Sequence, residues 1–191
     1  MTACPNIWRM AGVLLLVAAW PAAGDIVVTV QPSETVVEVG DYFTVDLLAD
    51  IPLADAIVGW GMDLSFDGSI LSHDPLVDVA IGPAFIPALA PDGDKLAGLF
   101  FGPPPPPPGL SGDDVLLATM TFEALMPGST SLNGGITLGD PSEGFIGPGL
   151  PAPVRTVLFS DASVTVIPAP AGVVLGLIGL GVVGWVKRRV G

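Results

Sequence analysis

The stretch VGWGMDLSF, residues 58–66, alternates apolar side chains with glycine, aspartate or serine along its whole length. A period of two is typical of a β-strand that buries one face and exposes the other. The same period recurs in FTVDLLAD at 43–50, broken only at Leu48, and in LLATMTFE at 116–123. Each apolar face needs a second apolar surface to cover it, so these strands predict two sheets packed face to face.

Between these stretches the sequence indicates further short strands separated by turns. We expect further strands at 26–30, 35–39, 76–81, 95–101, 130–138, 156–160 and 163–167. Turn signals separate them at the spacing of β-sandwiches, and they are Gly40-Asp41, Asp67-Gly68, Asp92-Gly93, Pro127-Gly128 and Asn133-Gly134-Gly135. In residues 116–123 the even-numbered positions form the apolar face, and Leu117 falls on the other face. No stretch shows a convincing helical period, which predicts an all-β domain.

The first 24 residues have the pattern of a secretory signal peptide. Arg9 precedes the apolar run AGVLLLVAAW, and the small residues Ala22-Ala23-Gly24 follow it. Asp25 is then the expected start of the mature chain, and Cys4, the single cysteine, lies in the segment to be removed. The exported protein must therefore hold itself together without a disulfide.

Charge is distributed very unevenly along the chain. All 19 acidic residues lie between Asp25 and Asp161, and the basic residues of that stretch are Lys95 and Arg155, which gives a formal charge near −17. Such a surface repels phosphate backbones, so nucleic acid is excluded as a partner. A self-repelling, soluble extracellular surface and a surface that binds divalent cations both fit this charge.

The chain ends in a segment with three physical parts. Pro168 and Pro170 end the last strand, residues 171–186 are 16 consecutive apolar residues, and the basic cluster Lys187, Arg188 and Arg189 follows. As a helix the apolar run is about 24 Å long, against a hydrocarbon core of about 30 Å. The positive-inside rule predicts that the basic cluster stays cytoplasmic and that residues 25–167 lie outside. A permanent single-span anchor is one interpretation of this tail.

The run GPPPPPPG, residues 102–109, interrupts the strand pattern. Six prolines cannot donate ladder hydrogen bonds, and they favour a polyproline II rod of about 19 Å. We expect an exposed, rigid spacer between strands. A ligand for a proline-recognition module is the alternative.

Three longer motifs follow one another along the chain: VEVGDYFTVDLLADIP at 37–52, VGWGMDLSFDGSIL at 58–71 and SGDDVLLATMTFEALMPGSTSL at 111–132. Together they resemble the cohesin family of dockerin-binding, carbohydrate-associated β-sandwich modules. In order and spacing they span most of residues 26–167. The resemblance implies a nine-stranded jelly roll with a binding role rather than a catalytic one, and a dockerin-like protein or a polysaccharide as the possible ligand.

The tail resembles the PEP-CTERM sorting signal of Gram-negative bacterial surface proteins. The similarity covers the Pro-x-Pro element of Pro168, Ala169 and Pro170, the glycine-rich apolar helix and the basic end, with Ala169 in the place of the glutamate that gives the signal its name. This resemblance implies processing by a membrane-embedded exosortase. The inner membrane is then an intermediate location, and the mature protein reaches the cell surface or the medium.

Candidate chemistry in the domain is sparse. His73 is the single histidine, and we expect it to be a surface residue in a loop; no Gly-x-Ser-x-Gly motif is present, and the usual zinc sites of histidine and cysteine are excluded. Trp60 shares a face with apolar neighbours and is expected in the core rather than in a sugar-stacking platform.

Calcium is the one cofactor that the sequence leaves open. Asp92 and Asp94, and Asp113 with Asp114, are expected in turns where carboxylates and carbonyl oxygens could converge on a hard cation. Neither pair has EF-hand spacing, and ordinary solvated turns are the alternative.

The sequence therefore predicts three segments: a signal peptide at 1–24, a cohesin-like β-sandwich at 25–167 and a sorting tail at 168–191. The function that fits them is that of an exported, non-enzymatic surface protein associated with exopolysaccharide or envelope material. A carbohydrate-active enzyme or its accessory domain is the alternative, because 19 acids leave room for a catalytic pair of carboxylates, although no spacing singles one out.

Overall fold

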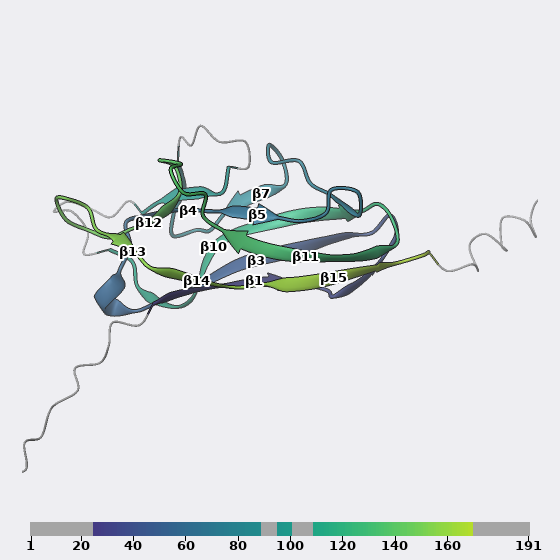
Figure 1. The fold of residues 1–191 in the computed structure, drawn as a ribbon, viewed down its shortest axis with the longest axis horizontal. Helices are drawn as coiled ribbons and strands as arrows, with labels where there is room; N and C mark the ends of the chain where they lie inside the picture. Colours follow the sequence, from purple (N-terminus) through teal and green to yellow (C-terminus); the bar gives the residue numbers. More distant parts are fainter. Residues whose placement is uncertain (1–24, 89–94, 101–108, 170–191) are drawn as a thin grey trace, which may run out of the picture.

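A computed structural model of the protein describes residues 25–88, 95–100 and 109–169, and these form an all-β domain (Figure 1). One 3-10 turn, η1 (Leu53–Asp55), accompanies the strands. The strands are β1 (Ile26–Pro32), β2 (Val36–Glu38), β3 (Tyr42–Ile51), β4 (Gly59–Gly61), β5 (Asp63–Ser65), β6 (Leu71–Ser72), β7 (Val79–Ile81), β8 (Ile86–Pro87), β9 (Ala97–Leu99), β10 (Gly112–Ala124), β11 (Gly128–Gly135), β12 (Gly144–Ile146), β13 (Val154–Arg155), β14 (Val157–Ser160) and β15 (Ala162–Ile167).

The first layer is a six-stranded sheet with the order β14-β1-β3-β10-β6, in which β7 also pairs with β10. Its centre is the long antiparallel pair of β3 and β10. The edge strand β14 runs parallel to β1, with Ile26 opposite Val157. Strand β1 shows why this layer forms, because its side chains alternate between buried and partly exposed positions from Ile26 to Val30.

The second layer consists of two hydrogen-bonded sheets that continue one another. Their orders are β2-β15-β11-β5 and β13-β12-β4-β9-β8. Strands β4 and β5 are separated by Met62 alone, and β11 pairs with β5 as β12 pairs with β4. The eight residues 136–143, here called the 136–143 loop, therefore lie opposite the single residue Met62. The strand that β11 and β12 would form together is interrupted by this loop.

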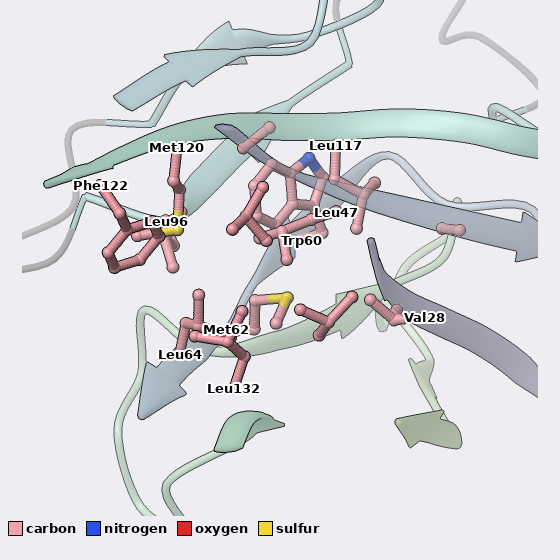
Figure 2. Packing of buried hydrophobic residues seen from close by; sticks show 14 of the residues in the cluster. Val28, Leu47, Trp60, Met62, Leu64, Leu96, Leu117, Met120, Phe122 and Leu132 are labelled. Carbon is pink, nitrogen blue, oxygen red and sulfur yellow. The ribbon is translucent and has the colours of Figure 1, made fainter. Parts of the chain in front are cut away.

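The core lies between the two layers. Figure 2 shows side chains from both layers meeting there, with Trp60, Met62 and Leu132 facing Leu47 and Met120. Phe122 is fully buried and stacks on Phe43 with ring centroids 5.7 Å apart. Burial of each large apolar side chain stabilises the fold by about 1.5–3 kcal/mol relative to exposure. The predicted sandwich, and the core position of Trp60, are confirmed.

Several details of the sequence prediction are wrong. Residues 58–66 form two strands rather than one, because the partner strand on one edge changes from β12 to β11 at Met62. On the other edge Met62 still donates its N–H to the carbonyl of Leu96. Residues 133–135 are not a turn but the end of β11. Packing explains why residue 134 of that strand is a glycine, since a Cβ there would lie 2.5 Å from Cδ1 of Phe159.

The predicted faces of residues 116–123 also need a correction. The register of β10 against β3 shifts between Leu116 and Ala118. This irregularity places one extra residue in β10, so Leu117 and Ala118 are both buried while Leu116 is only half-buried. A strict period of two cannot reveal such a bulge.

The expected count of nine strands is wrong as a count of segments, because the described residues contain fifteen. Interruptions such as Met62 and the 136–143 loop divide longer strands. Strands β6, β8, β12 and β13 were not predicted because two or three residues are too short to display a period. Predicted turns at Gly40-Asp41, Asp67-Gly68 and Pro127-Gly128 are confirmed, and Asp92-Gly93 lies outside the described residues.

The ends of the described chain lie far apart. Figure 1 shows β15 running out toward one end of the sandwich, while β12, β13 and η1 lie toward the opposite end. In the part of the chain that the structure describes, no helix is long and apolar enough to cross a bilayer. The predicted signal peptide and the apolar segment 171–186 lie outside the described residues.

Candidate functional site

A row of apolar residues crosses five strands of the second layer. The strand registers place Ile86 opposite Leu99, Leu99 opposite Gly59, Gly59 opposite Ile146, and Ile146 opposite Val154. These five residues are called the apolar row below. At about 4.8 Å between neighbouring strands, the row is about 19 Å long.

The apolar row lies on the outer face of the layer, because the next residue along each central strand points into the core. Trp60 is 3% exposed and Phe145 is fully buried. The exposed fractions within the row are 46% for Ile86, 41% for Leu99 and 77% for Val154. Ile146 is half-buried and Gly59 is buried, so the row exposes apolar side chains toward its two ends. Such a row is a candidate interaction surface.

Gly59 keeps the centre of the row shallow. A Cβ at this position would lie 3.1 Å from Cδ2 of Leu99, which is tighter than ordinary contact. The Leu99 side chain therefore leans over Gly59, and a larger residue there would displace it. The row presents two apolar ends, Ile86 with Leu99 and Ile146 with Val154, around a low centre.

The 136–143 loop lies beside the apolar row and covers Gly61. A Cβ on Gly61 would lie 2.0 Å from the carbonyl oxygen of Ser142. The loop is tied to β5 because the Thr137 hydroxyl donates a hydrogen bond of 2.7 Å to Oδ2 of Asp63. Within the loop, the Thr137 N–H donates to the carboxylate of Glu143.

This loop brings negative charge to the edge of the apolar row. Burial raises the pKa of Glu143, and the nearby carboxylates of Asp63 and Asp140 raise it further, while the hydrogen bond from the Thr137 backbone acts in the opposite direction. The pKa of Asp140 is lowered, because its carboxylate accepts hydrogen bonds from the hydroxyl and the N–H of Ser142. Three carboxyl groups, those of Asp63, Asp140 and Glu143, therefore gather beside the row.

One ion pair supports the same end of the sandwich. Nη1 of Arg155 lies 3.1 Å from Oδ1 of Asp55, and both side chains are largely covered. A Cβ on Gly147 would lie 2.7 Å from Nε of Arg155, so the guanidinium rests against that glycine. The pair fastens β13, which carries Val154 of the apolar row, to η1.

Of the four predicted calcium ligands, the structure describes only Asp113 and Asp114. Asp113 and Asp114 lie in β10 rather than in a turn, at the irregular start of the strand where Asp114 has a φ of 50° and donates its N–H to Oδ1 of Asp50. Asp92 and Asp94 lie outside the described residues. Among the residues that the structure describes, no group of three or more histidine, cysteine, aspartate or glutamate side chains could hold a metal ion. Calcium binding stays a prediction.

His73 lies in the predicted loop, but it is half-buried rather than freely exposed on the surface. Its ring is tilted against Phe122 with centroids 5.3 Å apart and stands edge-on to Phe66 at 6.3 Å. Both ring nitrogens are buried. Burial lowers the pKa of His73, and the charges of Asp78 and Asp74 together with the Thr121 backbone offset part of that effect. This side chain belongs to the aromatic core at the edge of the first layer.

The tail residues are only partly described. Pro168 and Ala169 follow β15 and are exposed. Pro170 and the basic residues Lys187, Arg188 and Arg189 lie outside the described residues, as does the hexaproline run.

Sequence reasoning missed the apolar row for a definite reason. Ile86 and Val154 belong to two-residue strands, and the five members of the row come from five segments that are far apart in the chain. The available signals were isolated: an isoleucine before Pro87, and the glycines around Trp60. Only the register of the second layer aligns them.

Comparisons with solved structures identify the fold. No protein-family model matches the sequence, and no characterised protein matches it at a significant level. Among similar structures is a type I cohesin–dockerin complex from Clostridium thermocellum, with 15% identity, a TM-score of 0.55 and coverage of 79% of this chain and 99% of the other. A cohesin module of a family 33 glycoside hydrolase from Clostridium perfringens has 8% identity, a TM-score of 0.52 and coverage of 74% and 99%.

A third similar structure shows that the likeness is not limited to cellulose-degrading assemblies. It is a non-cellulosomal cohesin from the archaeon Archaeoglobus fulgidus, with 15% identity, a TM-score of 0.51 and coverage of 75% of this chain and 92% of the other. At these identities the likeness concerns the fold alone. The domain is thus a cohesin-like β-sandwich.

Proposed function

We propose that this protein is an exported, non-catalytic binding protein whose sandwich captures a partner protein on the apolar row. The observation that carries the proposal is the alignment of apolar residues across five strands on the outer face of the second layer. Side chains such as Leu99 and Val154 have no core to fill there. Their burial by a partner removes apolar surface from water, which is the main source of affinity in protein interfaces.

The partner class follows from shape and charge. A low, straight row of about 19 Å accommodates one helix or one strand of a partner protein. The acidic 136–143 loop beside it, and the formal charge near −17 of residues 25–161, favour a partner that carries basic residues next to an apolar stripe. A dockerin-like module is the partner that the similar cohesin–dockerin complex suggests.

A matched pair of variants tests this proposal. Leu99→Asp places a charge in the centre of the apolar row, and Leu158→Asp makes the same change at an exposed leucine of β14, in the first layer. A panel of dockerin modules is screened by biolayer interferometry against the full-length chain in mild detergent. We expect Leu99→Asp to weaken binding by about 30-fold or more, as for a central interface residue, and Leu158→Asp to leave it unchanged.

Two results would contradict the proposal. The first is equal binding by the two aspartate variants, which would separate the apolar row from recognition. The second is binding that does not weaken as salt is raised, because contacts between an acidic module and a basic partner are screened by ions. Far-UV circular dichroism of both variants serves as the control for folding.

The export route is the second part of the proposal. We infer cleavage after residues 1–24, passage through the inner membrane with Lys187, Arg188 and Arg189 on the cytoplasmic side, and processing by an exosortase near Pro168, Ala169 and Pro170 in a Gram-negative bacterium. The exposure of Pro168 and Ala169 beyond β15 supports access of a processing enzyme to this backbone. The apolar row lies toward the other end of the sandwich, so a chain held by its tail would present the row away from the membrane (Figure 1).

The mature protein is then at the cell surface or in the medium, associated with exopolysaccharide or envelope material. Retention of the tail as a permanent anchor is the competing outcome. The mass of the native protein distinguishes the two outcomes.

A further inference from the structure

A shallow, open groove of about 720 Å³ lies on the flank of the sandwich, away from the apolar row, and is called the polar groove after the six polar residues that line it. Its polar lining consists of Gln31, Thr35, Ser131, Asn133, Asp161 and Ser163. These residues come from the end of β1, the approach to β2, the middle of β11 and the start of β15.

The groove exists because the chain crosses from one layer to the other at this point. Strand β14 pairs with β1 only as far as Thr29, and after Asp161 the chain continues as β15 in the second layer. Strand β2 covers β15 only from Thr165 onward. The flank between β1 and β2 is therefore left open.

This crossing also exposes backbone groups. The Thr165 N–H donates to the Thr35 carbonyl, so alternate residues of β15 direct their backbone toward β2. Ser163 is the next such residue, and β2 does not reach it. Within the described part of the chain, its N–H and C=O accordingly face the groove without a ladder partner.

The side chains add a mixed set of donors and acceptors. The amides of Asn133 and Gln31 make no hydrogen bond to any other described residue, and each offers both a donor and an acceptor. The Asp161 carboxylate accepts one bond from the Gly134 N–H, at 3.1 Å, and has acceptor capacity left. Pro32 and Ala162 supply apolar surface beside these groups.

We propose that this groove binds a neutral oligosaccharide. Sugar hydroxyls both donate and accept hydrogen bonds, and sugar rings have apolar C–H faces, so amides, hydroxyls, free strand-edge groups and small apolar surfaces together match this ligand class. The inference rests on the proposed association with exopolysaccharide and gives it a site. It is independent of the apolar row.

Two other ligand classes fit the groove poorly. Anionic ligands, such as phosphates or uronic acid polymers, would meet the Asp161 carboxylate and no lysine or arginine, because neither Lys95 nor Arg155 lines the groove. An extended peptide would need a run of strand-edge groups, but Ser163 offers a single residue, and Pro32 on the opposite wall has no N–H.

The test uses the full-length chain in mild detergent and oligosaccharide panels of equal length. One panel is neutral and the other contains uronic acids, and binding is followed by isothermal titration calorimetry. We expect the neutral panel alone to bind. Asn133→Ala and Gln31→Ala should each weaken that binding by about 2- to 10-fold, the effect of one hydrogen bond. Both side chains project from strand surfaces, so thermal unfolding should be unchanged and serves as the folding control.

The Leu99→Asp variant separates this inference from the protein-binding proposal, because it should lose the partner protein and keep the oligosaccharide. The inference is overturned if no neutral oligosaccharide binds at millimolar concentration, if the uronic acid panel binds as well, or if the two alanine variants bind like the wild type. Displacement of the sugar by a short extended peptide would show that the groove is a strand-addition site instead.

Discussion

Replacement of Gly61 by alanine should displace the 136–143 loop and destabilise the domain. Gly61 is held on both edges, by Ala97 of β9 and Gly144 of β12, so β4 has little freedom to move. The added Cβ would lie 2.0 Å from the Ser142 carbonyl oxygen, whereas ordinary contact begins at 3.4 Å. The loop must therefore retreat by about 1.4 Å.

The cost has two parts. Overpacking against backbone costs about 1–3 kcal/mol of unfolding free energy. A loop that retreats also loses the 2.7 Å hydrogen bond from Thr137 to Asp63, which contributes about 1 kcal/mol. Together they predict a loss of roughly 2–4 kcal/mol of unfolding free energy, or a Tm lowered by roughly 7–14 °C for a domain of this size.

Urea and thermal unfolding of the full-length chain, followed by circular dichroism, measure this effect, and hydrogen exchange of residues 136–143 locates it. Gly135→Ala is the matched control. This glycine ends β11 beside the same loop, but an added Cβ there has nothing within 4 Å. The free energy of unfolding of Gly135→Ala should lie within about 1 kcal/mol of that of the wild type. The reasoning is refuted if Gly61→Ala is as stable as Gly135→Ala, or if exchange in the loop stays unchanged.

Three further predictions concern other parts of the molecule. Burial lowers the pKa of His73 below its usual 6.5, so the unfolded chain binds a proton more readily than the folded chain. The free energy of unfolding should therefore fall as the pH drops below about 6.5. Urea unfolding between pH 7 and pH 5 measures this fall, and His73→Phe should remove the share of it that His73 contributes. Arg155→Met should lower the free energy of unfolding by roughly 1–3 kcal/mol, between the values for exposed and buried ion pairs. An unfolding midpoint equal to that of the wild type would show that the contact with Asp55 contributes nothing to stability. For the tail, mass spectrometry of the native protein should find a chain from about Asp25 to the Pro168–Pro170 region, without Trp185; a mature form that keeps residues 171–191 would mean a permanent anchor.

The sequence by itself determined the class of fold. Apolar alternation in β3, the middle of β10 and the residues around Trp60 depends only on neighbouring residues, since successive side chains of any strand point to opposite faces. Trp60 could be assigned to the core for the same reason. The acidic charge of the exported segment is likewise a property of composition and needs no coordinates.

Tertiary structure decided the features that join distant segments. The bulge that buries Leu117, the break at Met62 and the burial of His73 against Phe122 each depend on a partner strand or ring from elsewhere in the chain. The apolar row and the polar groove depend on tertiary structure entirely. Only the strand register aligns Ile86 with Val154, and only the crossing from β14 to β15 leaves Ser163 without a neighbouring strand. Periodicity reports which face a residue takes within its own strand, whereas pairing between strands decides which residues share that face.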